Sequence, residues 1–338
     1  MTSTSRQRRR IVGTAVCIAT ALTLAVSACS STGGKPDNSG NGIGGGGSVD
    51  TPRVTIAMIT HGVPGNAFWD LVQKGAETAA KKDNVELRYS ADPQAPNQAN
   101  NIQTAIDTKV NGIAVTLAKP DAMAPAVARA RQAGIPVVGL NAGYDRWKEL
   151  GVQQYFGQDE TIAGEAAGRR LTSDGAKKVL CVIHEQGNVS LESRCAGVEK
   201  GFTGGSVERI NVNSADMPSV NAAITAKLQQ DPAIDHIMAL DASIALTAVD
   251  AKGAANSSAK IATFDTNGEL VKAIKNDQVV WAIDQQPWLQ GYLAVDSLWL
   301  YLNNGDTIGG GQAVLTGPAF IDKTNIDSVA AYAERGTR

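Results

Sequence analysis

Residues 54–60, Val-Thr-Ile-Ala-Met-Ile-Thr, form a short apolar run rich in β-branched residues, which predicts a buried strand. Asn66 is placed to cap the helix that follows. The apolar positions of that helix recur at helical spacing, at Phe68, Leu71, Val72, Gly75, Ala76 and Ala79. A buried strand that leads into such a helix, repeated along a chain, predicts a parallel sheet with helices on its faces.

The same alternation continues in two series. The first series predicts further strands at 85–90, 113–117 and 137–140, with helices at 97–109 and 121–134. The second series predicts strands at 178–184, 207–212, 236–240, 261–264 and 279–283. Its predicted helices are 160–171, 191–202, 220–230, 243–252, 269–276 and 288–302. We therefore predict an α/β protein with two doubly wound parallel-sheet lobes.

Residues 1–28 predict a lipoprotein signal peptide rather than part of the fold. Four arginines precede an uncharged stretch from Ile11 to Ala28, which is the pattern of an export signal. The stretch is also long enough for an uncleaved anchor helix, but Val26-Ser27-Ala28-Cys29 resembles a bacterial lipobox, which favours lipid on Cys29. Residues 29–50 are rich in Gly and Ser and predict a flexible linker. The protein is thus expected outside the cytoplasm, anchored to the cell membrane.

The composition argues against several functions. Lys and Arg total 31 against 33 Asp and Glu, so no nucleic-acid partner is expected. The sequence has no phosphate-binding loop ending in Lys-Ser or Lys-Thr and no Gly-x-Ser-x-Gly elbow. Three scattered histidines without a His/Cys cluster predict no metal and no cofactor. A carboxylate pair for acid–base chemistry stays open, with Asp241 and Asp265 as its members.

Polar residues follow the predicted strands. In open α/β sheets a ligand binds beyond the carboxyl ends of the strands. These ends carry Thr60, His61, Leu117, Lys119, Asn141, Glu185, Asp241, Asp265, Asp284 and Gln285. Carboxylates and amides form paired hydrogen bonds with neighbouring hydroxyls, so the set predicts a polyhydroxylated ligand. Asp241 and Asp265 have a second interpretation, as caps of the helices that follow.

From Arg53 onward the chain resembles the type I periplasmic sugar-binding proteins of ABC importers, in the ribose- and galactose-binding group. The resemblance rests on Asn66-Ala67-Phe68-Trp69, Gly157-Gln158-Asp159-Glu160 and Arg194-Cys195-Ala196-Gly197, and on strand ends at Asn141, Asp265 and Gln285. It implies that Phe68 and Trp69 sandwich a sugar ring. The polar ligand-binding residues that we expect are Thr60, His61, Asn66, Asn141, Arg194, Asp241, Asp265 and Gln285.

The resemblance also implies an architecture and partners. It implies a periplasmic-binding-protein-like I fold, with a hinge of three segments between an N-terminal lobe (51–156 plus 286–312) and a C-terminal lobe (157–285 plus 313–338). The expected partner is an ABC permease with its separate ATPase, and the expected state is a monomer. Two alternatives stay open: a sugar-sensing receptor domain for a membrane signalling partner, and a lyase or glycosidase that uses Asp241 and Asp265.

Two departures from the ribose-type members bear on the ligand. Asn141-Ala142 stands in place of an Asp-Arg pair, and Asp241 stands in place of an Asn. These changes favour another small neutral sugar, a polyol or an inositol over ribose.

Because the site groups are expected to face the cleft, Arg194→Ala and Asp265→Ala should weaken binding by about 2–4 kcal/mol while leaving the fold intact.

The cysteines predict one disulfide. Cys17 lies in the predicted signal and Cys29 is the predicted lipid site, which leaves Cys181 and Cys195 in an oxidising compartment. Cys181 lies in a predicted strand and Cys195 in the helix that follows, so the two residues would approach each other. Two buried free thiols are the alternative.

Overall fold

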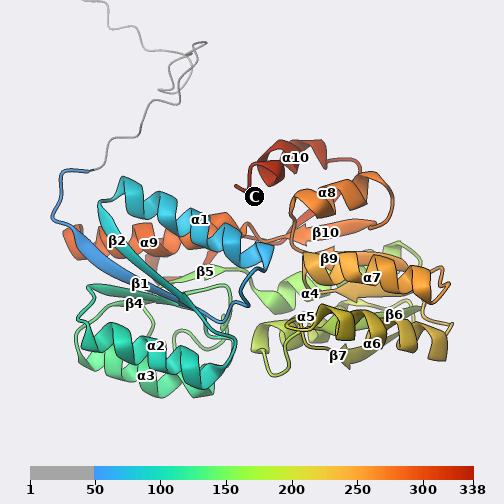
Figure 1. Ribbon diagram of the computed structural model, residues 1–338, viewed down its shortest axis with the longest axis horizontal. Helices are drawn as coiled ribbons and strands as arrows, with labels where there is room; N and C mark the ends of the chain where they lie inside the picture. Colours follow the sequence, from blue (N-terminus) through green and yellow to red (C-terminus); the bar gives the residue numbers. More distant parts are fainter. Residues whose placement is uncertain (1–48) are drawn as a thin grey trace, which may run out of the picture. The chain divides into compact units, whose positions relative to one another are not determined.

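The computed structural model describes residues 49–338. The predicted signal peptide, Cys29 and almost all of the predicted linker lie outside these residues. The described residues contain two six-stranded sheets, each with helices on both faces (Figure 1), which confirms the predicted fold class. Within this part of the chain no helix is both long and apolar enough to cross a bilayer.

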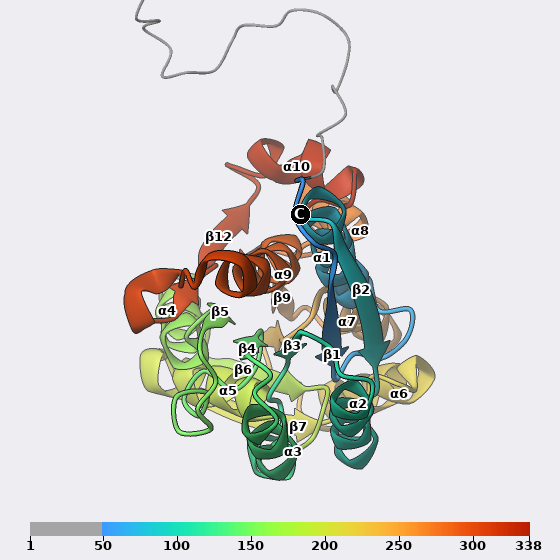
Figure 2. The same cartoon turned by 90° about the vertical axis from the view of Figure 1, so that its left-hand side faces the viewer.

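The first sheet has the strand order β11-β5-β4-β3-β1-β2, and its pairs are all parallel. Its strands are β1 (Val54–Thr60), β2 (Val85–Ala91), β3 (Gly112–Val115), β4 (Val137–Leu140), β5 (Tyr155–Gly157) and β11 (Val314–Leu315). Its helices are α1 (Ala67–Lys82), α2 (Ala95–Asp107), α3 (Pro120–Gln132) and α9 (Pro287–Asn304). Alternate residues of β1 point to opposite faces, so Ile56 packs with α1 and α9 while Ala57 packs with α2 and α3. Figure 2 shows α1 and α9 together on one side of this sheet.

The second sheet has the order β12-β10-β9-β8-β6-β7 and is parallel except for β12, which runs antiparallel to β10. Its strands are β6 (Lys178–Ile183), β7 (Ser206–Asn211), β8 (His236–Ala239), β9 (Lys260–Phe264), β10 (Trp281–Asp284) and β12 (Ala319–Asp322). Helices α4 (Glu160–Ser173) and α5 (Val189–Gly201) cover one face. The other face packs against α6 (Met217–Gln230), α7 (Ala242–Ala254), α8 (Gly268–Lys275) and α10 (Asp327–Glu334).

The chain crosses between the two lobes three times, after β5, after β10 and after β11. The short helix η1 (Gly309–Gly311) precedes the last crossing. Gly157 pairs with Leu315 in the first sheet, so the predicted boundary at 156/157 falls one residue early and the one at 312/313 falls three residues early. The Thr316 amide donates to the Gly157 carbonyl at 2.6 Å, and the Gln286 side chain donates to the Thr316 carbonyl at 2.8 Å. The three hinge segments are therefore tied directly to one another.

A disulfide joins Cys181 of β6 to Cys195 of α5, with their Cα atoms 6.1 Å apart. Odd-numbered residues of β6 face α4 and α5, as Val179 and Ile183 do, which brings the Cys181 side chain onto the helix-covered face. The predicted pairing is confirmed, and the bond anchors the helix turn that carries Arg194.

Breaking this bond is expected to lower the free energy of unfolding by about 3 kcal/mol, because the unfolded chain loses a closed loop of about 15 residues. Urea unfolding of the oxidised protein and of the Cys181→Ala/Cys195→Ala variant measures the difference. Reductant should shift the midpoint of the parent and leave that of the variant unchanged. Equal midpoints for oxidised and reduced parent would contradict the prediction.

Candidate functional site

The strand orders place the site. In both sheets the order reverses beside the first strand of the series, between β1 and β3 and between β6 and β8, and ligands bind at such switch points. The carboxyl ends of strands from both sheets line one cleft between the lobes.

Nine of the ten predicted ligand-binding residues line this cleft: His61, Asn66, Phe68, Trp69, Asn141, Arg194, Asp241, Asp265 and Gln285. Thr60 does not line it. Its side chain follows Ile56 and Met58 onto the face of the first sheet covered by α1 and α9. There its hydroxyl lies 3.0 Å from the Tyr89 hydroxyl. The chain turns after Thr60, so His61 enters the cleft instead.

Aromatic rings form one wall of the cleft. Asn66 caps α1 by accepting from the Phe68 amide at 2.9 Å, which fixes the first turn that carries Phe68 and Trp69. The Trp69 ring meets Phe68 and His61 edge to face, with centroids 5.0 and 4.7 Å apart. A Cβ at Gly62 would lie 2.6 Å from the Trp69 ring, so only glycine permits this position. Such rings present apolar faces on which a sugar ring stacks.

Arg194 lies in the opposite wall and is held from several sides. Its Nε and Nη2 donate to the two Glu160 carboxylate oxygens at 2.6 and 2.9 Å, and its Nη1 donates to the Leu240 carbonyl at 3.0 Å. Its guanidinium also lies 4.5 Å from the centre of the Phe264 ring. Burial disfavours the charge, but Glu160 raises the pKa of Arg194 above its ordinary value. The guanidinium is therefore a fixed, permanently charged group.

A chain of side chains leads from the cleft to the hinge. Gln285 donates to Asp265 at 2.6 Å and accepts from Asn141 at 3.4 Å and from Gln290 at 3.0 Å. Burial raises the pKa of Asp265 to about 8, and Asp241 and Glu160 add to the rise while Arg194 and Gln285 oppose it. Asn141 and Asp265 have positive φ values of 64° and 70°, a strained conformation that functional sites often hold.

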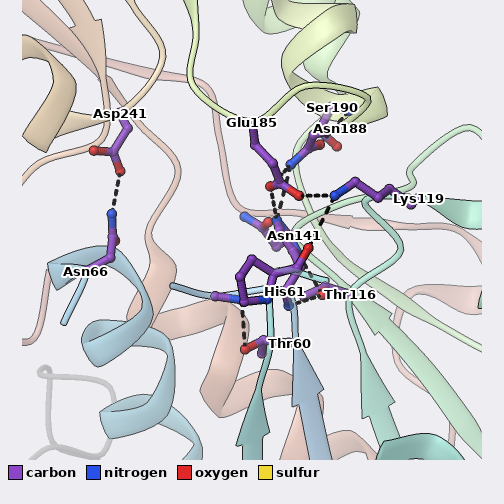
Figure 3. A network of polar contacts seen from close by, with 12 residues as sticks. Thr60, His61, Asn66, Thr116, Lys119, Asn141, Glu185, Asn188, Ser190 and Asp241 are labelled. Carbon is purple, nitrogen blue, oxygen red and sulfur yellow. Dashed lines mark hydrogen bonds and ion pairs between the residues drawn. The ribbon is translucent and has the colours of Figure 1, made fainter. Parts of the chain in front are cut away.

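Asp241 caps a helix, as one of its two interpretations predicted, and it also reaches across the cleft. One carboxylate oxygen caps α7 by accepting from the Ser243 and Ile244 amides at 2.7 and 3.3 Å. The other oxygen accepts from Asn66 of the first lobe at 3.4 Å (Figure 3). Asp265 is not a cap, since Asn267 caps α8.

Polar contacts across the mouth of the cleft hold the lobes together. Lys119 of the first lobe donates to Glu185 of the second at 2.9 Å, and Asn188 lies 3.2 Å from the His61 ring (Figure 3). Burial works against the Glu185 charge, but His61, Lys119 and Asn188 hold its pKa below the ordinary value. The Val189 amide also donates to the Ala118 carbonyl at 3.0 Å. We call Lys119, Glu185, Asn188 and His61 the latch.

Lys119→Met is expected to speed ligand dissociation about fivefold, because a half-buried ion pair of about 1 kcal/mol that exists only between closed lobes is lost. Stopped-flow tryptophan fluorescence measures the rate. The matched control is Lys275→Ala, which removes an ion pair with Asp327 inside the second lobe. Equal dissociation rates for parent and Lys119→Met would contradict the role of the latch.

Several cleft residues were not predicted as ligand-binding: Val63, His184, Glu185, Asn188, Ser190, Leu191, Ser214 and Leu240. Glu185 was among the strand ends, and His184 ends the predicted strand 178–184. Burial lowers the pKa of His184, so it is uncharged at neutral pH, and its buried Nδ1 has no hydrogen-bond partner. Asn188 caps α5. An Asn that follows a strand end and can cap the next helix was the feature of the sequence that could have pointed to it.

Residues 56–307 match the periplasmic binding protein domain. The chain is 58% identical to a carbohydrate transporter of Acidothermus cellulolyticus whose structure holds myo-inositol; the match covers 85% of this chain and 100% of that one, with a TM-score of 0.84. It is 26% identical to a xylose/arabinose-binding protein of Sulfolobus acidocaldarius, over 81% of this chain and 72% of that protein. A ribose import binding protein of Bacillus subtilis is 24% identical, over 78% and 83% respectively.

The chain therefore belongs to the periplasmic binding protein family, as the sequence motifs predicted. Proteins of this family bind solutes outside the cytoplasmic membrane and serve transport.

Proposed function

We propose that this protein captures a small neutral cyclic polyol, myo-inositol or a close monosaccharide relative, and delivers it to an ABC permease. The observation that carries the proposal is the cleft itself, where aromatic faces oppose a ring of amide, carboxyl and guanidinium groups drawn from both lobes. Such groups pair with adjacent hydroxyls. Myo-inositol bears a hydroxyl on every ring carbon, and a protein 58% identical to this chain binds it.

Delivery to a permease also requires that the protein be held at the membrane and that it release its ligand intact. We infer that Cys29 carries the lipid anchor, that residues 29–50 act as a tether, and that the ligand leaves chemically unchanged. Lobe closure by the hinge would give the permease a distinct closed form to recognise. A monomer suffices, because both walls of the cleft come from one chain.

A thermal-shift series tests the ligand. A ligand that binds only the folded state raises the melting temperature with its concentration. We expect myo-inositol to give a larger rise than D-ribose, D-xylose, D-galactose or xylitol, and to change the fluorescence of Trp69. Absence of any shift across this panel would refute the proposal. Nuclear magnetic resonance of the ligand after long incubation should show it unaltered, whereas a new product would indicate an enzyme.

A further inference from the structure

The charge of Arg194 is already paired before any ligand binds. Glu160 takes two of its N–H groups, and both side chains are nearly inaccessible, with 4% and 3% of their surfaces exposed. Gln158 donates to Glu160 at 2.8 Å and holds the carboxylate in place. A guanidinium has five N–H donors, and three are used by Glu160 and Leu240. Arg194 therefore offers two directed donors to a ligand, with its charge balanced from behind.

The other ionisable groups at the cleft leave no net positive charge. Lys119 is paired with Glu185, and burial lowers the pKa of both His61 and His184. Asp241 and Asp265 are hydrogen-bonded to neutral groups. Among the described residues neither of these carboxyl groups forms an ion pair with Lys or Arg. The balance is thus negative even when Asp265 holds a proton.

We propose that Glu160 is a specificity-determining residue, which cancels the charge of Arg194 so that the cleft accepts uncharged polyols and excludes their acidic analogues. The inference rests on the proposed function and deepens it by naming the rejected class: uronic acids and phosphorylated polyols. An anionic group in the cleft would meet Asp241 and Asp265 without an unpaired cation, and a buried charge needs a partner. Glu160 acts through Arg194 and is a positioning residue.

The test compares matched neutral and acidic probes in the parent and in Glu160→Gln. Titration calorimetry gives dissociation constants for myo-inositol and myo-inositol 1-phosphate, and for D-galactose and D-galacturonate. We expect the parent to bind each acidic probe at least 100-fold more weakly than its neutral counterpart. In Glu160→Gln the ratio of the acidic probe's dissociation constant to that of its neutral counterpart should be at least tenfold smaller. Any effect of probe size is the same in both proteins, so the change in the ratio reports the charge.

One further variant completes the design. Asp241→Asn keeps an efficient helix cap and removes a negative charge from the cleft. The ratio of acidic to neutral dissociation constants should therefore fall in this variant as well. If circular dichroism shows that Glu160→Gln is unfolded, Asp241→Asn is the variant that decides the test.

The outcomes separate the two ideas. A parent that binds neither neutral probe overturns the proposed function and the inference with it. A parent that binds a neutral probe, with an unchanged ratio in the folded Glu160→Gln protein, overturns the inference alone. An unchanged ratio in Asp241→Asn does the same if Glu160→Gln does not fold.

Discussion

Replacing Asp265 by asparagine is expected to weaken ligand binding and, at alkaline pH, to stabilise the fold. The pKa of Asp265 is about 8 in the folded protein against an ordinary value of 3.8. The folded state thus holds a proton that the unfolded chain releases between these pH values, and stability falls as pH rises through this window. Asparagine cannot ionise, so it removes this loss of folding stability. The loss is absent below pH 4 and complete above pH 8.

The gain above pH 8 is at most about 6 kcal/mol, since each pKa unit corresponds to about 1.4 kcal/mol. Binding at pH 9 should weaken by about 2 kcal/mol, or about thirtyfold, because asparagine cannot supply the charged acceptor that the ionised Asp265 offers there. Melting curves at pH 4 and pH 9 and a ligand titration measure both effects. Asp250→Asn, on the exposed side of α7, is the control. A lower melting temperature for Asp265→Asn at pH 9 would contradict the argument.

Arg194→Met is expected to abolish tight binding and to cost about 3–5 kcal/mol of stability, because it leaves the buried Glu160 carboxylate without its partner. The structure therefore revises the expectation that the fold would be unaffected by the loss of Arg194. Glu160→Leu/Arg194→Met should recover most of the lost stability, since an apolar pair of similar volume is tolerated at such sites.

Urea unfolding separates the two effects in these variants. The double variant should match the parent within about 1 kcal/mol in the free energy of unfolding and still fail to bind the ligand. An Arg194→Met protein as stable as the parent would show that Glu160 has found another partner.

The long elements and most of the site could be predicted from the sequence, because each rests on a local pattern. Strand β1 and helix α1 have clear apolar periodicity, and residues at the strand ends must gather at one edge of a parallel sheet. Strands β5 and β11 have only three and two residues, too few to show a period. Strand β12 was missed as well, and its antiparallel direction has no mark in the sequence.

The pairings within the site could not be predicted. Glu160 and Arg194 are 34 residues apart and meet because α4 and α5 pack closely, where a Cβ on Gly164 would lie 2.3 Å from the Arg194 carbonyl. The latch joins residues of different lobes, so it depends on the hinge angle. Thr60 was predicted to line the cleft because hydrophobic periodicity locates the end of a strand but not the residue at which the backbone turns.

Helix α9 has a consequence for how the chain is made. It covers one face of the first sheet beside α1, and its residues Ala294, Val295 and Leu298 complete the core around Ile56 and Met58. Residues 287–304 leave the ribosome only after the whole of β6 to β10 has been synthesised. Until then the first lobe has an apolar face open to water, and a domain without its full core is marginal. The topology thus delays stable folding of the N-terminal half until translation is nearly finished, which keeps the nascent chain in an unfolded form that a translocation channel can thread.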